Sequence, residues 1–89
     1  MEKFSLELKN QLGLHARASA KFVATASRFI SKIEVCYGKH IVNGKSIMGI
    51  MMLGAKCGNF LECTAEGDDE QELKAALTRL IENKFDEEN

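Results

Sequence analysis

Two residues near the start of the chain have the types and the spacing for phosphoryl chemistry. His15 stands in the stretch GLHARASAKF, residues 13–22, where helical periodicity begins, and Arg17 follows two positions later. The first amides of a helix have no intrahelical partners, so with the helix dipole they attract anions. The same positive end disfavours an imidazolium and leaves a neutral, nucleophilic ring. An arginine fork binds phosphate oxygens, so this group favours phosphoryl transfer through a phosphohistidine.

A histidine can also stand at a helix start without any chemical role. No acid partner, serine nucleophile or metal-ligand set is evident beside His15 in the sequence. The chain has 89 residues and is too small to enclose a substrate. If His15 reacts, we therefore expect a carrier of a group rather than a complete enzyme, with no cofactor and no metal.

A second stretch, NGKSIMGIMML at residues 43–53, joins a capping serine to a short apolar helix. Ser46 is the predicted N-cap, either with no further role or as a site of phosphorylation, since a phosphate there would meet free amides. Met48, Met51 and Met52 crowd this helix with their apolar neighbours Ile47, Ile50 and Leu53. Two turns cannot bury every one of these side chains, so we expect either an adaptable docking surface or loose core packing.

Hydrophobic periodicity predicts the elements that position these residues. Alternating apolar and polar residues predict four strands, over 4–8, 33–37, 40–43 and 61–65. Helical spacing predicts three helices, over 16–27, over 47–53, and after a capping stretch at 67–69 with an apolar stripe over 73–81. The final segment FDEEN is expected to be a solvated acidic tail. The predicted order is β-α-β-β-α-β-α.

Strands that alternate in this way need only one covered face, which predicts an α+β fold. We expect a single domain over residues 1–89, with a four-stranded antiparallel sheet covered on one face by three helices. The residues expected to face the helices are Leu6, Leu8, Ile33, Val35, Leu61, Cys63 and Ala65.

Composition argues against several classes of function. The chain has 12 basic and 13 acidic residues, so its net charge of -1 gives no reason to expect nucleic-acid or membrane binding. No signal peptide or membrane-spanning run is evident, and we expect a cytoplasmic protein. The three cysteines lack the close pairing of zinc or redox motifs, so we expect reduced thiols.

These motifs resemble those of the HPr family, the histidine-containing phosphocarriers of the bacterial phosphoenolpyruvate-dependent phosphotransferase system. GLHAR at 13–17 is similar to the family's active-site motif, and NGKSIMGIMMLGA at 43–55 to its regulatory serine region. AEGDDEQE at 65–72 is similar to the beginning of its last helix. The resemblance covers nearly the whole chain and implies the family's HPr-like open-faced β-sandwich.

The resemblance also implies roles and partners. His15 would accept a phosphoryl group on Nδ1 from phosphorylated enzyme I and pass it to IIA domains of sugar permeases. Arg17 would steady the phosphate, and Ser46 would be modified by an ATP-dependent HPr kinase/phosphorylase. Apart from the resemblance, nothing in the sequence demands more than a monomer. The apolar docking surface shared by its partners would include Ala20, Ile47, Met48 and Met51.

The chain departs from the family pattern directly after the arginine. The family usually has HARPAA, whereas this chain has HARASA with Ala18 and Ser19. Proline early in a helix pre-sets its geometry, while alanine restores an amide donor. We therefore expect a working site with a more mobile first helical turn.

Three other interpretations remain open on the sequence. The protein could serve only a regulatory phosphorelay in nitrogen metabolism or transcription, or it could be an inactive relative. An RNA-binding module can also have the order β-α-β-β-α-β, but it needs aromatic residues on the open sheet face and a basic surface. The expected open face carries Ser5, Glu7, Glu34, Glu62 and Thr64.

Overall fold

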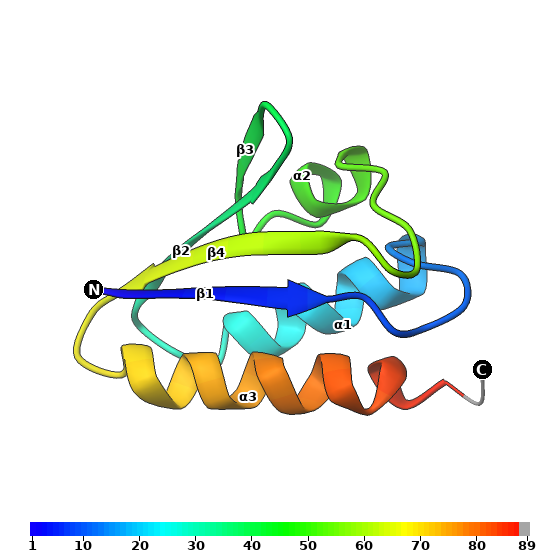
Figure 1. Cartoon of the computed structure of the whole chain (residues 1–89). Helices are drawn as coiled ribbons and strands as arrows, with labels where there is room; N and C mark the ends of the chain where they lie inside the picture. Colours follow the sequence, from blue (N-terminus) through cyan, green and yellow to red (C-terminus); the bar gives the residue numbers. More distant parts are fainter. Residues whose placement is uncertain (88–89) are drawn as a thin grey trace.

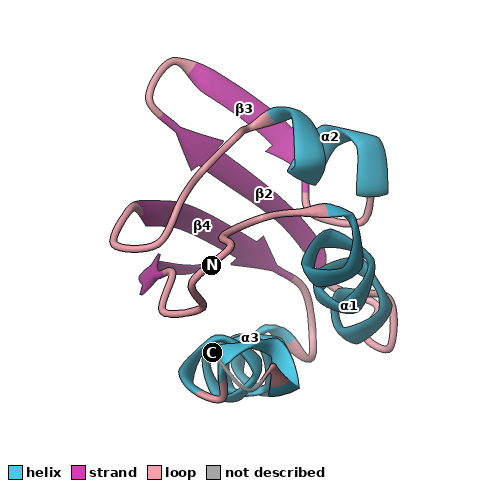
Figure 2. Cartoon of the chain, turned by 90° about the vertical axis from the view of Figure 1, so that its right-hand side faces the viewer, coloured by secondary structure: helices cyan, strands magenta, loops and turns pink. Residues whose placement is uncertain are grey.

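The computed structural model describes residues 1–87, and its central feature is one antiparallel sheet (Figure 1). Four strands pair in the order β1-β4-β2-β3. Figure 2 shows the helices along one side of this sheet, with the other side open. The predicted fold class and element order are therefore confirmed. The strands are β1 (Glu2–Glu7), β2 (Lys32–Tyr37), β3 (His40–Asn43) and β4 (Phe60–Glu66).

Strand register places the apolar positions on the helix side. Leu6 of β1 pairs with Leu61 of β4, and Val35 of β2 pairs with Cys63 of β4. Side chains alternate between the two faces of a strand, so these four residues share the face that the helices cover. All four are buried. Burial raises the pKa of the Cys63 thiol to about 12, so this cysteine behaves as the core residue that was predicted.

The helices bury one stripe each against the sheet and against one another. On α3 (Glu70–Glu82) the buried residues Leu73, Leu77 and Ile81 recur every four positions. Phe22 and Val23 of α1 (Ala16–Ala26) enter the same core. The short α2 (Ile47–Met52) packs beside α1 and β3. The predicted helices are confirmed, with ends one or two residues from those expected.

The acidic tail was predicted wrongly. Phe85 lies in a 3-10 turn, η1 (Lys84–Asp86), and its side chain is fully buried in the core. Glu87 follows with only 14% of its side chain exposed. A phenylalanine gains far more from burial than from exposure, so it draws this end of the chain onto the domain. Residues 88 and 89 lie outside the described range.

The predicted cap of α3 is also different in detail. Asp69 stands at the N-cap position, but its side chain does not bond the helix. Its carboxylate accepts hydrogen bonds from the amides of Ile30 and Ser31 at 3.0 and 2.9 Å. Glu70 bonds the helix start instead, because its Oε1 accepts from the Gly67 amide at 3.0 Å. Asp69 therefore ties the end of the α1–β2 connection to α3.

Candidate functional site

The loop between β1 and α1 is shaped by Gly13. Its φ of +67° lies in the left-handed region, which glycine tolerates best. A Cβ at this position would stand 2.6 Å from the carbonyl oxygen of Ala55. The next amide, of Leu14, donates to that same oxygen at 3.1 Å. Close contact with the segment after α2 therefore sets the direction in which the chain enters α1.

His15 occupies the N-cap of α1, as predicted, but its ring does not cap the helix. Its carbonyl accepts the first helical hydrogen bond from the Ser19 amide at 2.9 Å. The imidazole is half-buried, with 30% of the side chain exposed. Arg17 is the second residue of α1, in the same first turn, and its side chain is exposed. The unpaired amides of the first turn and the guanidinium therefore offer an anion site beside the ring.

An acid partner of His15, which the sequence did not reveal, comes from the end of the chain. His15 Nε2 lies 2.5 Å from Glu87 Oε2, although the two residues are 72 positions apart. The other carboxylate oxygen, Oε1, accepts from Asn10 Nδ2 at 3.2 Å. Asn10 is fully buried and also donates to the Gly13 carbonyl at 2.8 Å. In the sequence, the only indication that this acidic segment packs against the core was its single apolar residue, Phe85.

Ser46 caps α2 as predicted. Its hydroxyl oxygen accepts a hydrogen bond from the Gly49 amide at 3.0 Å. The side chain is half-buried, and α2 lies beside α1 in Figure 2. Ser46 therefore stands at the start of the helix that neighbours the His15 helix.

The predicted docking residues differ in exposure. Met48 is 65% exposed and Ile47 is 44% exposed. Ala20 and Met51 are less exposed, because their side chains are half-buried. The expectation that α2 leaves some methionines exposed is confirmed. Met52, which the sequence interpretation placed in the same methionine cluster, is 76% exposed. Leu12, which was not predicted as a docking residue, is 69% exposed.

Ser19, the second departure from the family pattern, is buried beneath the helix start. Its hydroxyl donates to the Leu14 carbonyl at 3.5 Å. Ala18 is fully buried as well. Both residues therefore pack beneath the site rather than facing a bound phosphate.

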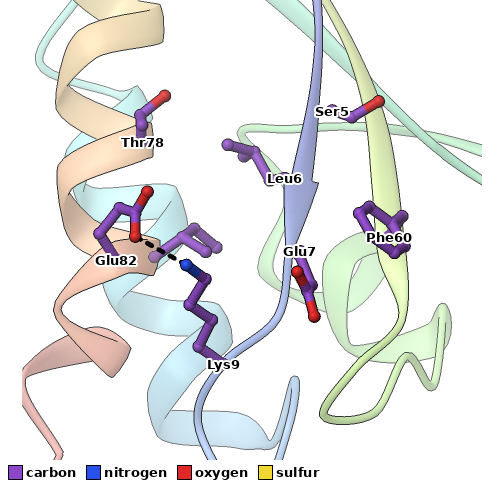
Figure 3. Close-up of a pocket in the computed structure, with 8 residues that line it drawn as sticks. Ser5, Leu6, Glu7, Lys9, Phe60, Thr78 and Glu82 are labelled. Atoms are coloured by element: carbon purple, nitrogen blue, oxygen red, sulfur yellow. Dashed lines mark hydrogen bonds and ion pairs between the residues drawn. The ribbon is translucent and has the colours of Figure 1, made fainter.

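A separate hollow lies between β1 and α3, with a volume of about 210 Å³ (Figure 3). An ion pair of 2.9 Å between Lys9 Nζ and Glu82 Oε2 spans it. None of the predicted site residues lines this hollow. Its lining residues are Ser5, Leu6, Glu7, Lys9, Phe60, Thr78, Ile81 and Glu82.

The open sheet face carries one exposed aromatic residue, Phe60, that the sequence interpretation did not name. Its neighbours on that face include the exposed Glu7 and Glu62. Acidic neighbours repel a nucleic-acid backbone, so this face lacks what an RNA-binding sheet requires.

Residues 1–87 contain neither a candidate metal centre nor a candidate membrane-spanning helix. Within that range, no group of three or more histidine, cysteine, aspartate or glutamate residues could hold a metal ion. Among the same residues, no helix is both long enough and apolar enough to span a bilayer.

Comparisons with known proteins agree on one family. The family described as the PTS HPr component phosphorylation site matches residues 2–83. The phosphocarrier protein HPr of Neisseria meningitidis serogroup B is 53% identical over 87 residues, which cover 98% of each chain. That of Treponema pallidum is 46% identical, over 94% of this chain and 96% of the relative.

Solved structures agree in fold as well as in sequence. The crystal structure of HPr-C-His from Thermoanaerobacter tengcongensis matches with a TM-score of 0.94 and 54% identity over the whole of both chains. The Bacillus anthracis phosphocarrier HPr matches with a TM-score of 0.85 and 36% identity, over 90% of this chain and 95% of that one.

Proposed function

The chain belongs to the HPr family, the phosphocarriers of the phosphotransferase system, and from this premise we propose that His15 is its phosphorylated residue. The proposed donor is phosphorylated enzyme I, and the proposed acceptors are IIA domains of sugar permeases. One observation carries the assignment. His15 stands at the start of α1 with Nε2 bonded to Glu87, which leaves Nδ1 as the nitrogen available to phosphorus.

The proposed transfer needs little beyond correct positioning. The Nδ1 lone pair attacks phosphorus, a P–N bond forms, and the bond between phosphorus and the donor breaks. Arg17 and the unpaired amides at the start of α1 stabilise the charge on the phosphoryl oxygens. The same groups serve the return step, in which the acceptor attacks phosphorus and the P–N bond breaks.

We further propose that Ser46 is a regulatory site for an HPr kinase/phosphorylase. Support comes from its half-exposed hydroxyl at the start of α2, next to the exposed Ile47 and Met48. A phosphate adds nearly two negative charges beside an apolar surface, so it would weaken partner docking. Ser46→Asp is expected to slow phosphorylation of His15 by enzyme I, and a rate equal to that of the wild type would contradict this role.

The apolar surface around α2 is the proposed docking site for enzyme I and the IIA domains. It comprises Ala20, Ile47, Met48 and Met51, as the resemblance implied, and we add Met52 because of its 76% exposure. Methionine suits a surface that must fit several partners. These partners are proposed to meet the protein as a monomer in the cytoplasm.

The experiment that tests the function is direct. The pure protein is incubated with phosphoenolpyruvate, magnesium and the enzyme I of the same organism, and its intact mass is measured before and after mild acid. We expect an acid-labile gain of one phosphoryl group that is absent from His15→Ala. A wild-type protein that gains no phosphoryl group would contradict the proposal.

A further inference from the structure

A second hollow, with a volume of about 260 Å³, lies between α1 and α3, which pack against each other (Figure 2). It begins on α1 at Thr25, which stands ten positions after His15. A helix rises 1.5 Å per residue, so about 15 Å of helix axis separates the two places. The hollow is therefore distinct from the His15 site. Its lining residues are Thr25, Arg28, Ala76, Arg79, Leu80, Asn83 and Asp86.

Helical spacing brings these residues together. The lining residues from α3 and its C-cap fall at positions 76, 79, 80 and 83, so from one turn to the next they are three or four positions apart and share a face. Thr25 and Arg28 are three positions apart at the end of α1 and directly after it. Ala76 has no side chain beyond Cβ, so it leaves room between the longer polar side chains around it.

Two arginines give the hollow a positive charge. Neither Arg28 nor Arg79 forms an ion pair with any of residues 1–87. The Arg28 guanidinium lies 5.5 Å from the centroid of the Phe29 ring, a contact that stabilises the cation without neutralising it. Within the described range the lining contains one acid, Asp86, so its formal charge is +1. The hollow therefore favours an anion, although the chain as a whole has a net charge of -1.

The other lining groups suit a ligand that carries hydroxyl groups besides its anionic group. Guanidinium forks bind the oxygens of a phosphate with two parallel hydrogen bonds. The Thr25 hydroxyl and the Asn83 carboxamide can donate or accept, whereas the ionised Asp86 carboxylate can only accept. Asp86 therefore repels a second anionic group but accepts hydrogen bonds from hydroxyl groups. Ala76 and Leu80 offer apolar contact to a carbon skeleton.

We propose that this hollow binds a small sugar phosphate, with the phosphate on Arg28 and Arg79 and the sugar hydroxyl groups on Asp86 and Asn83. Sites for drug-sized ligands have volumes of roughly 300–1,000 Å³. The hollow is slightly smaller than this range, which fits a single phosphorylated monosaccharide. The inference goes beyond the proposed function of His15 and does not depend on it.

An NMR titration of the full ¹⁵N-labelled chain tests the proposal. The probe is ribose 5-phosphate, and ribose and inorganic phosphate are added in separate titrations at constant ionic strength. We expect saturable shifts of the Thr25, Arg28, Arg79 and Asn83 amides, tighter binding of ribose 5-phosphate than of inorganic phosphate, and no binding of ribose. Equal affinity for the two anions would overturn the assignment of a sugar phosphate. Shifts confined to the first turn of α1 would overturn the site.

Two variants and a matched control test the arginines. Arg28→Gln and Arg79→Gln change exposed side chains, so both proteins are expected to fold as the wild type does. Each should weaken the binding of ribose 5-phosphate about tenfold, as for loss of one charge-assisted hydrogen bond. Lys39→Gln removes an equal charge from the exposed turn between β2 and β3 and should leave the affinity unchanged. Wild-type affinity in both arginine variants, or equal weakening in all three proteins, would overturn the proposal.

Discussion

The His15 imidazole has two nitrogens with different surroundings, and this difference supports the proposed chemistry. Nε2 is bonded to a carboxylate from the chain end, while the ring stays partly exposed at the start of a helix. The proposed anion-binding groups, Arg17 and the first helical amides, belong to the same turn of α1. The imidazole, a carboxylate that bonds it and the first amides of a helix therefore meet at one helix end.

The backbone at Gly13 leaves no room for a side chain. Gly13→Ala would combine a left-handed φ with a Cβ only 2.6 Å from the Ala55 carbonyl oxygen. Gly54 has a similar φ of +65° but open space around the added carbon, so Gly54→Ala is the matched control. We expect Gly13→Ala to lower the free energy of unfolding by about 1–3 kcal/mol more than the control, which is the cost of overpacking. Chemical denaturation measures the difference, and equal losses would contradict it.

The elements are joined by polar contacts as well as by the core. Asp69 links α3 to the segment before β2 through Ser31 and the Ile30 amide. The hydrogen bond from the Ser31 hydroxyl, followed by the two backbone amides, holds the pKa of Asp69 below its ordinary value of 3.8. A lowered carboxylate pKa means that the folded state prefers the ionised form.

A pH dependence of stability follows from Asp69. Its contribution is complete above the ordinary value of 3.8 and is lost as the pH falls from there through the lower folded-state pKa. Asp69→Asn is therefore expected to be less stable than wild type at pH 7, with a smaller difference in strong acid. Denaturation at both pH values measures this. Asp68→Asn, which changes an exposed neighbouring acid, is the control. A difference that is independent of pH would contradict the prediction.

The first turn of α1 lacks the proline that is usual in the family. With Ala18 in place of the family's proline, the amides of Arg17 and Ala18 are expected to exchange faster than those in the middle of α1. Amide hydrogen exchange measured by NMR tests this, with Phe22 and Val23 as internal references for the middle of the helix. Equal protection would mean that burial of Ala18 alone holds the turn.

Docking of the chain end on the rest of the domain is a property of the whole molecule. Phe85→Ala is expected to lower the free energy of unfolding by about 3–5 kcal/mol, because it removes a fully buried aromatic side chain. It should also free Glu87 from His15, which the NMR signals of the His15 ring would report. Phe60→Ala is the control, because Phe60 is 54% exposed and its loss should cost much less. Similar losses in both variants would contradict the docking.

Local patterns in the sequence were sufficient for most of the fold. Periods of two and 3.6 residues identified the strands, the helices and the buried face, including Cys63 and Leu61. Ser46 and His15 were placed correctly at their helix starts because caps depend on a few neighbouring residues. The motif around His15 and its resemblance to the HPr family came from the same short stretches.

Tertiary structure alone decided which distant segments meet at the site. Glu87 reaches both His15 and Asn10 from 72 and 77 positions away, and the Ala55 carbonyl approaches Gly13 from the far side of α2. Asp69 likewise bonds a segment 38 and 39 residues away rather than its own helix. Such contacts depend on how segments dock after the core forms, and no local period encodes them. The sequence by itself therefore determined the elements and the position of His15 at a helix start, while the fold determined which carboxylate meets its ring.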